Sequence, residues 1–312
     1  MNELNPTVAA CLVGERAGFR WFHVEDTKGP ALDALAAQFG LHELAVEDCR
    51  HIGQRAKVEE YEGHIFIVAN AIHFDKDKLG CWLGEVDFFV GKDFLISIRE
   101  GKSRTFEATL PKFKVDHRLA HPGRLLMAML DYMVDQYLPV LDTIEEQIEG
   151  LEEKVLQEPS PALLTRLFDL RRALIDYRRA AMSMREVLNH LLYRTEPYFR
   201  TQQAYFRNVY DHVVRALDFV ETYRDILNGV LDVHLSATAN RTNDVMKVLA
   251  VFATLATPFL LITSFYGMNF EYLPLLHEPR GAMTATAACC SSAWACSRIS
   301  TARNGSDDLA AD

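Results

Sequence analysis

The sequence predicts an α+β membrane protein in which an N-terminal α/β domain precedes long helices, the last of which runs into a membrane. Three observations lead to this fold class. The first hundred residues mix strand-like and helix-like stretches, the middle of the chain is almost purely helical, and residues 248–265 contain no charged side chain. With 312 residues, 49% of them hydrophobic, the chain can bury one large core or two smaller ones.

Four stretches of the N-terminal region are predicted as strands, because aromatic and β-branched residues dominate them and Gly, Lys or Asp bounds them. They are FRWFHV, HIFIVANAIH, GEVDFFVG and DFLISIR, at residues 19–24, 64–73, 84–91 and 93–99. Between them, ALDALAAQFG and ELAVEDCRH have apolar residues at the helical period, and Gly40 is the expected C-terminal cap of the first helix. Residues 1–120 are therefore expected to form an α/β domain.

Proline marks the expected starts of two long amphipathic helices, at His121-Pro122 and Ser160-Pro161. The first, over residues 124–156, carries glutamates on its polar face, and the second, over residues 161–192, carries arginines. An antiparallel hairpin with ion pairs between the two helices explains this pattern. The alternative is an acidic face that attracts cations.

A third helix is expected from about Tyr205 to Tyr266, which makes it about 90 Å long at 1.5 Å per residue. That length exceeds a globular core, so residues 121–244 are interpreted as a helix bundle and stalk. Apolar residues recur along its first part in steps of three and four, as in a coiled-coil seam, with Arg224 and His234 in the remaining positions. The apolar members are Phe206, Tyr210, Val213, Leu217, Val220, Leu227 and Leu231.

Residues 245–266 are predicted to span the membrane, because they contain the uncharged run 248–265, whose length is typical of a transmembrane helix. Arg241 and Lys247 lie on its N-terminal side, whereas residues 267–279 contain no Lys or Arg. The positive-inside rule then places the stalk and the N-terminus in the cytoplasm and residues 267–280 in an extracytoplasmic loop. The first twenty residues have no signal-peptide pattern, which agrees with a cytoplasmic N-terminus.

Composition excludes several classes of function. A net charge of -10 argues against nucleic acid as a partner and favours cations. The six cysteines have no zinc-site spacing, and no Walker, GxGxxG or nucleophile-elbow motif is present. Two sets of acidic and histidine residues lack a recognised catalytic spacing, so we expect neither an enzyme nor a catalytic cofactor. These sets are Glu47, Asp48 and His51, and His23, Glu25 and Asp26.

Methionine, leucine and small or hydroxylated residues share one face of the predicted membrane helix. At 100° per residue they fall within an arc of about 100°. In a membrane such a stripe indicates either close helix packing or the lining of a pore. The residues are Met246, Leu249, Ala250, Ala253, Thr257, Leu260 and Ser264, which follow Asn243.

The pentapeptide Tyr-Gly-Met-Asn-Phe, at residues 266–270, resembles the signature of the CorA family of magnesium transporters. The resemblance extends over roughly residues 40–280. Residues 205–254 are similar to that family's stalk and first membrane helix, and residues 44–68 are similar to its cytoplasmic domain. The triplet GMN alone is a weak match, but its place at the outer end of a membrane helix makes it specific.

The resemblance implies a funnel-shaped homopentamer with the first membrane helix of each copy lining a central pore. Gly267, Met268 and Asn269 would form the selectivity filter, in which a ring of neutral Asn269 amides holds hydrated Mg²⁺ without trapping it. The implied pore lining has a hydrophobic gate at Met246 and Leu249, with an acidic ring at Asp232 below it. The remaining lining positions are Asn243, Thr257 and Leu260.

A divalent cation channel of a bacterial cytoplasmic (inner) membrane is the implied function, driven by the membrane potential. Its ion is Mg²⁺, with Co²⁺ or Ni²⁺ as further ions, and Mg²⁺ is also the expected regulatory ion. The implied partners are divalent cations, the lipid bilayer and further copies of the chain. Two alternatives stay open, namely a zinc transporter of the same fold and a non-conducting, membrane-anchored scaffold.

The sequence departs from the family pattern in two regions. Asn208 stands where the family often has an acidic residue of an intracellular metal site, so it would offer that site an oxygen without a charge. Residues 281–312 do not resemble the second membrane helix and basic tail that the family has after the loop. A shift of reading frame near codon 280 explains this tail, and a genuine single-span variant is the alternative.

Overall fold

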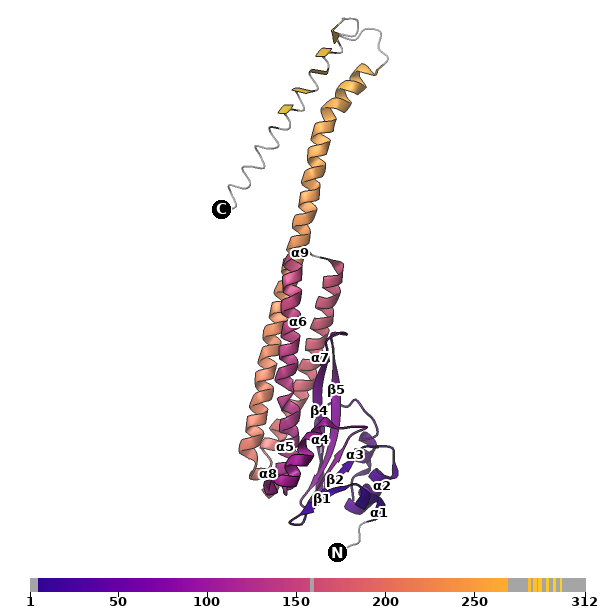
Figure 1. Cartoon of the computed structure of the whole chain (residues 1–312), viewed down its shortest axis with the longest axis vertical. Coiled ribbons are helices and arrows are strands. Elements are labelled where there is room, and N and C mark those ends of the chain that lie inside the picture. The colour runs from indigo at the N-terminus through magenta and orange to yellow at the C-terminus, as the bar shows by residue number, and fades with distance from the viewer. Residues whose placement is uncertain are drawn as a thin grey trace. The chain divides into compact units, whose positions relative to one another are not determined.

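The structure is a computed structural model that describes residues 5–157, 160–268 and single positions or pairs between 280 and 298. The chain divides into two compact units, Met1–Val233 and His234–Asp312. Figure 1 labels the elements of both units. In chain order they are α1 (Pro6–Ala10), β1 (Leu12–Arg16), β2 (Phe19–Val24), α2 (Pro30–Phe39), α3 (Glu43–Asp48), β3 (Lys57–Tyr61), β4 (His64–Asp75), β5 (Gly80–Gly91), β6 (Phe94–Ile98), α4 (Arg104–Val115), the short 3-10 helix η1 (His117–Leu119), α5 (Pro122–Asp135), α6 (Tyr137–Gln157), α7 (Pro161–Leu192), α8 (Pro197–Arg200) and α9 (Gln203–Tyr266).

The first unit is built on a six-stranded sheet with the order β1-β2-β6-β5-β4-β3. The pair β2–β6 is parallel and every other pair is antiparallel. All four predicted strands are confirmed as β2, β4, β5 and β6, and the two N-terminal helices are confirmed as α2 and α3. Gly40 caps α2 in the left-handed conformation, with φ 64°, as its position after the last helical residue predicts.

Both faces of the sheet are covered by helices, because alternate residues of the central strands enter two separate cores. On β4, Ile65 and Ile67 belong to the core shared with α5, α6, α7 and the first part of α9, whereas Phe66 and Val68 belong to the core shared with α1, α2 and α3. The sheet therefore lies between two helical layers, which explains why its central strands are apolar on both faces.

The prolines predicted to start helices do so, since α5 begins at Pro122 and α7 at Pro161. The single helix expected over residues 124–156 is wrong, however, because the structure divides it at Gln136 into α5 and α6. Pro139 lies in the first turn of α6 and has no backbone N–H to continue the hydrogen-bond ladder of α5. The break falls where that donor is missing.

Two buried tyrosines join the helices to the sheet next to this break. The hydroxyl of Tyr137 donates to the carbonyl of Asn70 on β4 at 2.7 Å, and the hydroxyl of Tyr177 on α7 donates to the carbonyl of Tyr137 at 3.0 Å. Both side chains are fully buried, so each hydroxyl needs such a partner. The start of α6 is thereby fixed against β4 and α7.

In the first unit, α9 packs against the bundle with a stripe that keeps one row of the predicted seam and shifts the other row by one position. Phe206, Val213, Val220 and Leu227 are buried as predicted, but the second row of buried residues is Val209, Ala216, Tyr223 and Val230. Arg224, assigned to the seam from its spacing, is exposed and pairs with Glu221 at 2.7 Å. Tyr223 takes the inward position because its ring can be buried, whereas a guanidinium cannot be buried without a partner.

The opposite charges of α6 and α7 do not form the predicted ion pairs between the helices. Among the described residues, the arginines of α7 pair elsewhere: Arg178 contacts Glu221 of α9 at 2.7 Å, and Arg179 contacts Asp176 of its own helix at 3.9 Å. Arg166 reaches α6 but donates to the neutral amide of Gln147. The two helices are instead held together by their buried apolar faces.

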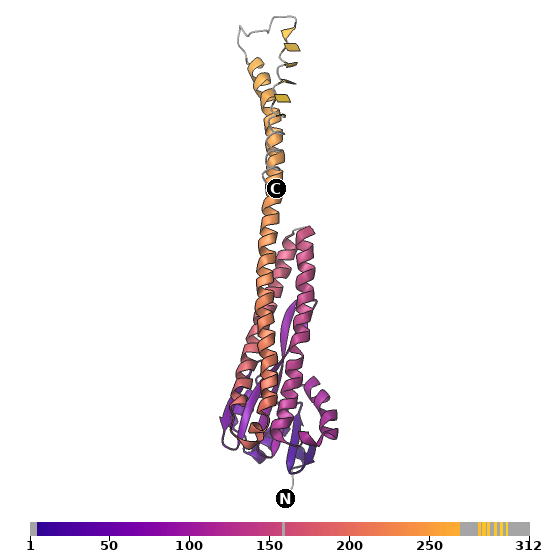
Figure 2. The same cartoon turned by 90° about the vertical axis from the view of Figure 1, so that its left-hand side faces the viewer.

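The second unit contains the C-terminal part of α9, which ends at Tyr266 as predicted. This helix includes an 18-residue window with a mean hydropathy of 2.1, none of which is buried within the chain. Its length and composition suffice to cross a membrane. Figure 2 shows α9 itself as one unbroken ribbon.

Candidate cation pathway

The predicted pore-lining side chains of α9 are all exposed in the single chain. Met246 is 59% and Leu249 is 61% exposed, and Asn243, Thr257 and Leu260 are exposed as well. A contiguous apolar helix surface of this kind is unfavourable in water and marks contact with lipid or with other protein chains. The chain by itself therefore does not complete the environment of these side chains.

Hydroxyl groups along this part of α9 are satisfied within the helix. Thr254, Thr257 and Thr263 donate to carbonyls three or four residues earlier, at distances from 2.7 to 2.9 Å. Pro258 continues the helix although it removes one backbone donor. Such internal pairing is required where no water is available, so it suits a helix in a membrane.

The GMN triplet begins at the end of α9. The N–H of Gly267 donates to the carbonyl of Thr263 at 2.9 Å and closes the last helical turn. A Cβ at this position would lie 3.0 Å from the same carbonyl oxygen, so a close backbone approach favours glycine here. Met268 is half exposed, whereas Asn269 lies outside the described residues and its predicted place in a filter stays a prediction.

The two predicted cytoplasmic positions lie on the part of α9 that belongs to the first unit. Asp232 and Asn208 are both exposed. Asn208 makes no contact that defines a metal site within the described part of the chain, but it lies one helical turn before His212. A metal site that includes Asn208 would therefore lie beside the side chains around His212.

His212 belongs to a three-residue cluster that the sequence did not reveal. One ligand atom each from Asp131, Asp135 and His212 lies within 4.8 Å of the others, and the His212 Nδ1 is 3.6 Å from Asp135 Oδ1. Asp131 and Asp135 are one turn apart on α5, so both carboxylates face α9. The four-residue spacing of Asp131 and Asp135 in the sequence could have indicated that the two carboxylates share one face of a helix. Their contact with His212 on α9 depends on tertiary packing.

Electrostatics make this cluster receptive to a cation. Burial raises the pKa of Asp131 above its usual range, and the neighbouring carboxylate of Asp135 raises this pKa further. Two carboxylates and an imidazole are ligands suited to a divalent metal such as Mg²⁺, Mn²⁺ or Co²⁺. A bound dication would relieve the repulsion between the two carboxylates.

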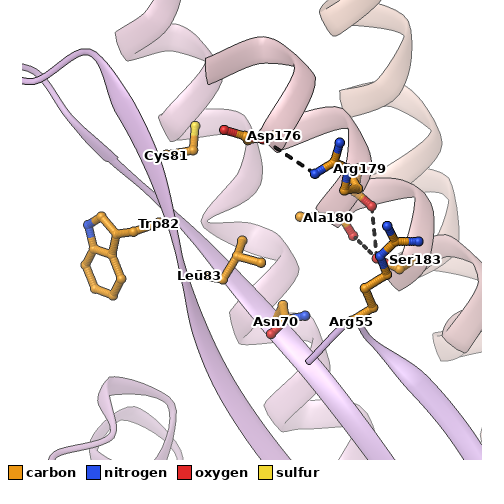
Figure 3. Close-up of a pocket in the computed structure, with 9 residues that line it drawn as sticks. All are labelled: Arg55, Asn70, Cys81, Trp82, Leu83, Asp176, Arg179, Ala180 and Ser183. Atoms are coloured by element: carbon orange, nitrogen blue, oxygen red, sulfur yellow. Dashed lines mark hydrogen bonds and ion pairs between the residues drawn. The ribbon is translucent and has the colours of Figure 1, made fainter. Parts of the chain in front are cut away.

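A cavity of about 240 Å³ between the sheet and α7 provides less convergent chemistry (Figure 3). Arg179 in its wall is paired with Asp176, and the hydroxyl of Ser183 donates to the carbonyls of Arg179 and Ala180. Figure 3 shows the Trp82 ring directed away from these groups. Most polar groups of the wall are thus engaged with one another and not directed toward a common ligand.

The two residue sets considered for catalysis have structural roles instead. His23 is buried, its Nδ1 lies 2.9 Å from the hydroxyl of Ser97, and its ring stacks on Phe106 at 3.9 Å. Burial lowers the pKa of His23 to about 4, so the ring is neutral at physiological pH. In the other set, Asp48 pairs with Lys57, and His51, which follows α3, contacts the carbonyl of Glu47 in that helix.

Comparison with known proteins gives a consistent result. The family model described as CorA-like Mg2+ transporter protein matches residues 16–296. The cobalt/magnesium transport protein CorA of Thermotoga maritima is 37% identical over 242 residues, which cover 76% of this chain and 69% of that protein. A putative metal ion transporter of Bacillus subtilis is 30% identical over 275 residues, which cover 86% of this chain and 84% of that protein.

Solved structures agree at the level of the fold. The complete structure of the CorA magnesium transporter from Methanocaldococcus jannaschii superposes with a TM-score of 0.77 at 24% identity. The match covers 90% of this chain and 89% of that one. The full-length CmaX protein superposes with a TM-score of 0.73 at 18% identity, covering 91% of this chain and 88% of that one. The fold of an α/β unit followed by one long helix is thus shared with both of these structures.

Proposed function

Because the chain belongs to the CorA-like Mg2+ transporter family, a family of divalent cation transporters and not of enzymes, we propose that it conducts Mg²⁺ across a bacterial cytoplasmic membrane. The observation that carries the proposal is the exposed apolar stripe of α9, which includes Met246 and Leu249. It lies on the same helix whose first part packs in the first unit. Both side chains are more than half exposed in the described part of the chain, and a ring of copies would cover them.

In the proposed assembly, five copies place the stripe of α9 around a central pore. Met246 and Leu249 form a constriction that excludes water when it is narrow, which raises the barrier to a hydrated ion. Asn243, Thr257 and Leu260 line the remaining path, and Asp232 attracts cations at the cytoplasmic end. Asn269 amides form the outer filter and accept hydrogen bonds from the water shell of the ion.

Mg²⁺ is favoured over Zn²⁺ because the proposed filter consists of neutral oxygens and the chain keeps the Gly-Met-Asn triplet intact. Mg²⁺ gives up its water reluctantly and is therefore held through its hydration shell. Zn²⁺ prefers histidine nitrogen and cysteine thiolate ligands, and the described stripe contains neither His nor Cys. The name of the Thermotoga maritima relative includes both cobalt and magnesium, so Co²⁺ is a second candidate ion.

The cluster of Asp131, Asp135 and His212 is the proposed cytoplasmic sensor. It joins α5 to α9, and α9 continues into the stripe that holds the gate. A cation bound there stabilises the contact between the two helices, because it removes the repulsion between the carboxylates. Plentiful cytoplasmic Mg²⁺ would thereby favour one arrangement of α9 and close the pore.

Growth of a bacterial strain that lacks its own magnesium transporters tests the proposal. One culture expresses the chain as it stands, and another expresses a version in which residues 280–312 are replaced by an apolar helix and a basic tail. Rescue at low Mg²⁺ by either version supports Mg²⁺ conduction, and rescue by the second alone assigns the defect to the tail. Failure of both versions, with the protein present in the membrane, contradicts the proposal and favours a non-conducting, membrane-anchored scaffold.

Ion preference is measured on the version that conducts. Uptake of Mg²⁺, Co²⁺ and Zn²⁺ into proteoliposomes is compared at equal membrane potential. We expect uptake of Mg²⁺ and Co²⁺ to exceed that of Zn²⁺. Uptake of Zn²⁺ alone would identify a zinc transporter of the same fold.

A further inference from the structure

A second cavity, of about 170 Å³, lies on the face of the sheet covered by α2 and α3. It is distinct from the cluster of Asp131, Asp135 and His212, with which it shares no residue. We refer to it as the acidic cavity. Its wall is formed by Thr27, Cys49, Ile52, Leu83, Gly84, Glu85, Asp87, Ile98, Arg99 and Glu100.

Asp87 is the unusual member of this wall. Its side chain is only 4% exposed, and its Oδ1 accepts no hydrogen bond from any residue that the structure describes. The thiol of Cys49, at the end of α3, lies against the same carboxyl group. A buried carboxyl oxygen without a donor is costly, so a functional occupant is a reasonable explanation for its retention.

Glu85 presents a second carboxylate to the same space. It lies two residues before Asp87 on β5, and alternate residues of a strand face the same side of the sheet. Its Oε2 accepts hydrogen bonds from the backbone N–H groups of Gly53 and Gln54, each at 2.7 Å, which fixes the carboxylate. Within the described residues, Oε1 accepts no hydrogen bond.

The charge around these two groups is negative on balance. Glu100 adds a third carboxylate, held by the N–H and hydroxyl of Thr27, while Arg99 is the cationic side chain of the wall. Lys57 is near but is held by Asp48 and Glu59. Burial, followed by the charge of Glu85, raises the pKa of Asp87 to about 8.

We propose that the acidic cavity holds a hydrated divalent cation between Asp87 Oδ1 and Glu85 Oε1, within a single copy of the chain. A dication would keep Asp87 ionised and would compensate the negative balance of the wall. The site is independent of the proposed pore, because its residues all belong to the α/β unit.

The size of the cavity favours a cation that keeps its water. Among the described residues, only Asp131, Asp135 and His212 bring three ligand atoms within 4.8 Å of one another. The side chains of the acidic cavity therefore do not form a set of three direct metal ligands. A cavity of about 170 Å³ has room for an ion together with several of its waters. Mg²⁺ binds in this way more readily than softer metals do.

The test counts bound Mn²⁺, a spectroscopic substitute for Mg²⁺, on the full chain in detergent by the loss of the free-ion electron paramagnetic resonance signal. We expect Asp87→Asn to bind one Mn²⁺ fewer per chain than the unchanged protein, and Glu85→Gln to bind the same ion more weakly. Mg²⁺ should displace this ion. The matched control is Asp93→Asn, which removes an exposed carboxylate from the turn before β6.

An unchanged count in Asp87→Asn overturns the proposal, and so does an equal loss in Asp93→Asn, since surface charge would then hold the ion. Thermal unfolding in the presence of a chelator verifies that Asp87→Asn is folded. Asn269→Ala should retain this Mn²⁺, and Asp131→Asn should lose a different one. The acidic cavity can therefore fail while the proposed transport function holds, and the reverse is also true.

Discussion

His212 Nδ1 on α9 lies 3.6 Å from Asp135 Oδ1 on α5, a contact between a long helix that continues toward the membrane and a short helix that packs on the sheet. Asp131 completes the cluster one turn earlier on α5. The pKa of Asp131 is raised by burial and by Asp135, so the cluster carries charge repulsion that a cation can remove. Its geometry connects the α/β unit to the helix that carries the proposed gate.

Removing a ligand from this cluster should weaken closure by cytoplasmic Mg²⁺. For Asp131→Asn or His212→Ala, we expect the Mg²⁺ concentration that halves the conductance to rise at least about tenfold, since metal sites lose affinity on this scale when their ligand arrangement is damaged. Patch recordings with varied Mg²⁺ on the cytoplasmic side measure it. Asp225→Asn, on the exposed face of α9, serves as the control, and equal shifts in both would argue against a sensor.

Adding a charge one turn before His212 should have the opposite effect. Asn208 is exposed and offers only a neutral amide, so Asn208→Asp places a carboxylate beside the cluster. We expect closure at lower Mg²⁺ concentration in the same recordings. Unchanged sensitivity would mean that this position does not contribute to cation sensing in this chain.

The filter prediction concerns Asn269. Asn269→Ala removes the amide oxygens that would accept hydrogen bonds from the water shell of the ion. Mg²⁺ uptake should therefore be lost while the oligomer stays intact. Uptake into proteoliposomes and size-exclusion chromatography with light scattering measure the two properties. Normal uptake by the variant would remove Asn269 from the filter, and loss of the oligomer would leave its role structural.

Two glycines in neighbouring helices should respond in opposite ways to alanine. A Cβ at Gly123 on α5 would lie 1.9 Å from the carbonyl oxygen of Tyr198 in α8, whereas a Cβ at Gly150 on α6 meets nothing within 4 Å. Gly123→Ala should cost at least about 2 kcal/mol of unfolding free energy, and Gly150→Ala should gain about 0.5–1 kcal/mol from helix propensity. Chemical unfolding followed by circular dichroism compares them, and a tolerated Gly123→Ala would contradict the packing of α5 on α8.

Asp87 should make stability depend on pH. Burial raises its pKa from the usual 3.8 to about 8 in the folded chain, so between these values the folded state binds the extra proton. Stability conferred by that proton is present at low pH and is lost as pH rises through about 4 to 8, with a limiting slope of about 1.4 kcal/mol per pH unit. In a chelator, Asp87→Asn should remove this slope relative to the unchanged chain. Equal pH profiles would mean that Asp87 titrates normally despite its burial.

Local patterns were sufficient for the elements whose residues have one dominant tendency. The four aromatic and β-branched strands, the helix starts at Pro122 and Pro161 and the cap at Gly40 were all predictable. Strands β1 and β3 were missed, because LVGER and KVEEY are short and charged and are strands only through pairing with β2 and β4. The helix α4 was also missed, since Pro111 lies inside it.

By itself, the sequence determined the fold class, the apolar helix with its stripe and the family, because each of these depends on residues close together in the chain or on a linear motif. The tertiary structure decided which face of α9 is buried, that Arg178 of α7 forms its ion pair with α9 and not with α6, and that Asp131, Asp135 and His212 meet. It also placed Asp87 in a cavity beneath α3. Such contacts join residues far apart in sequence, and side-chain periodicity fixes the face of an element but not the partner it meets.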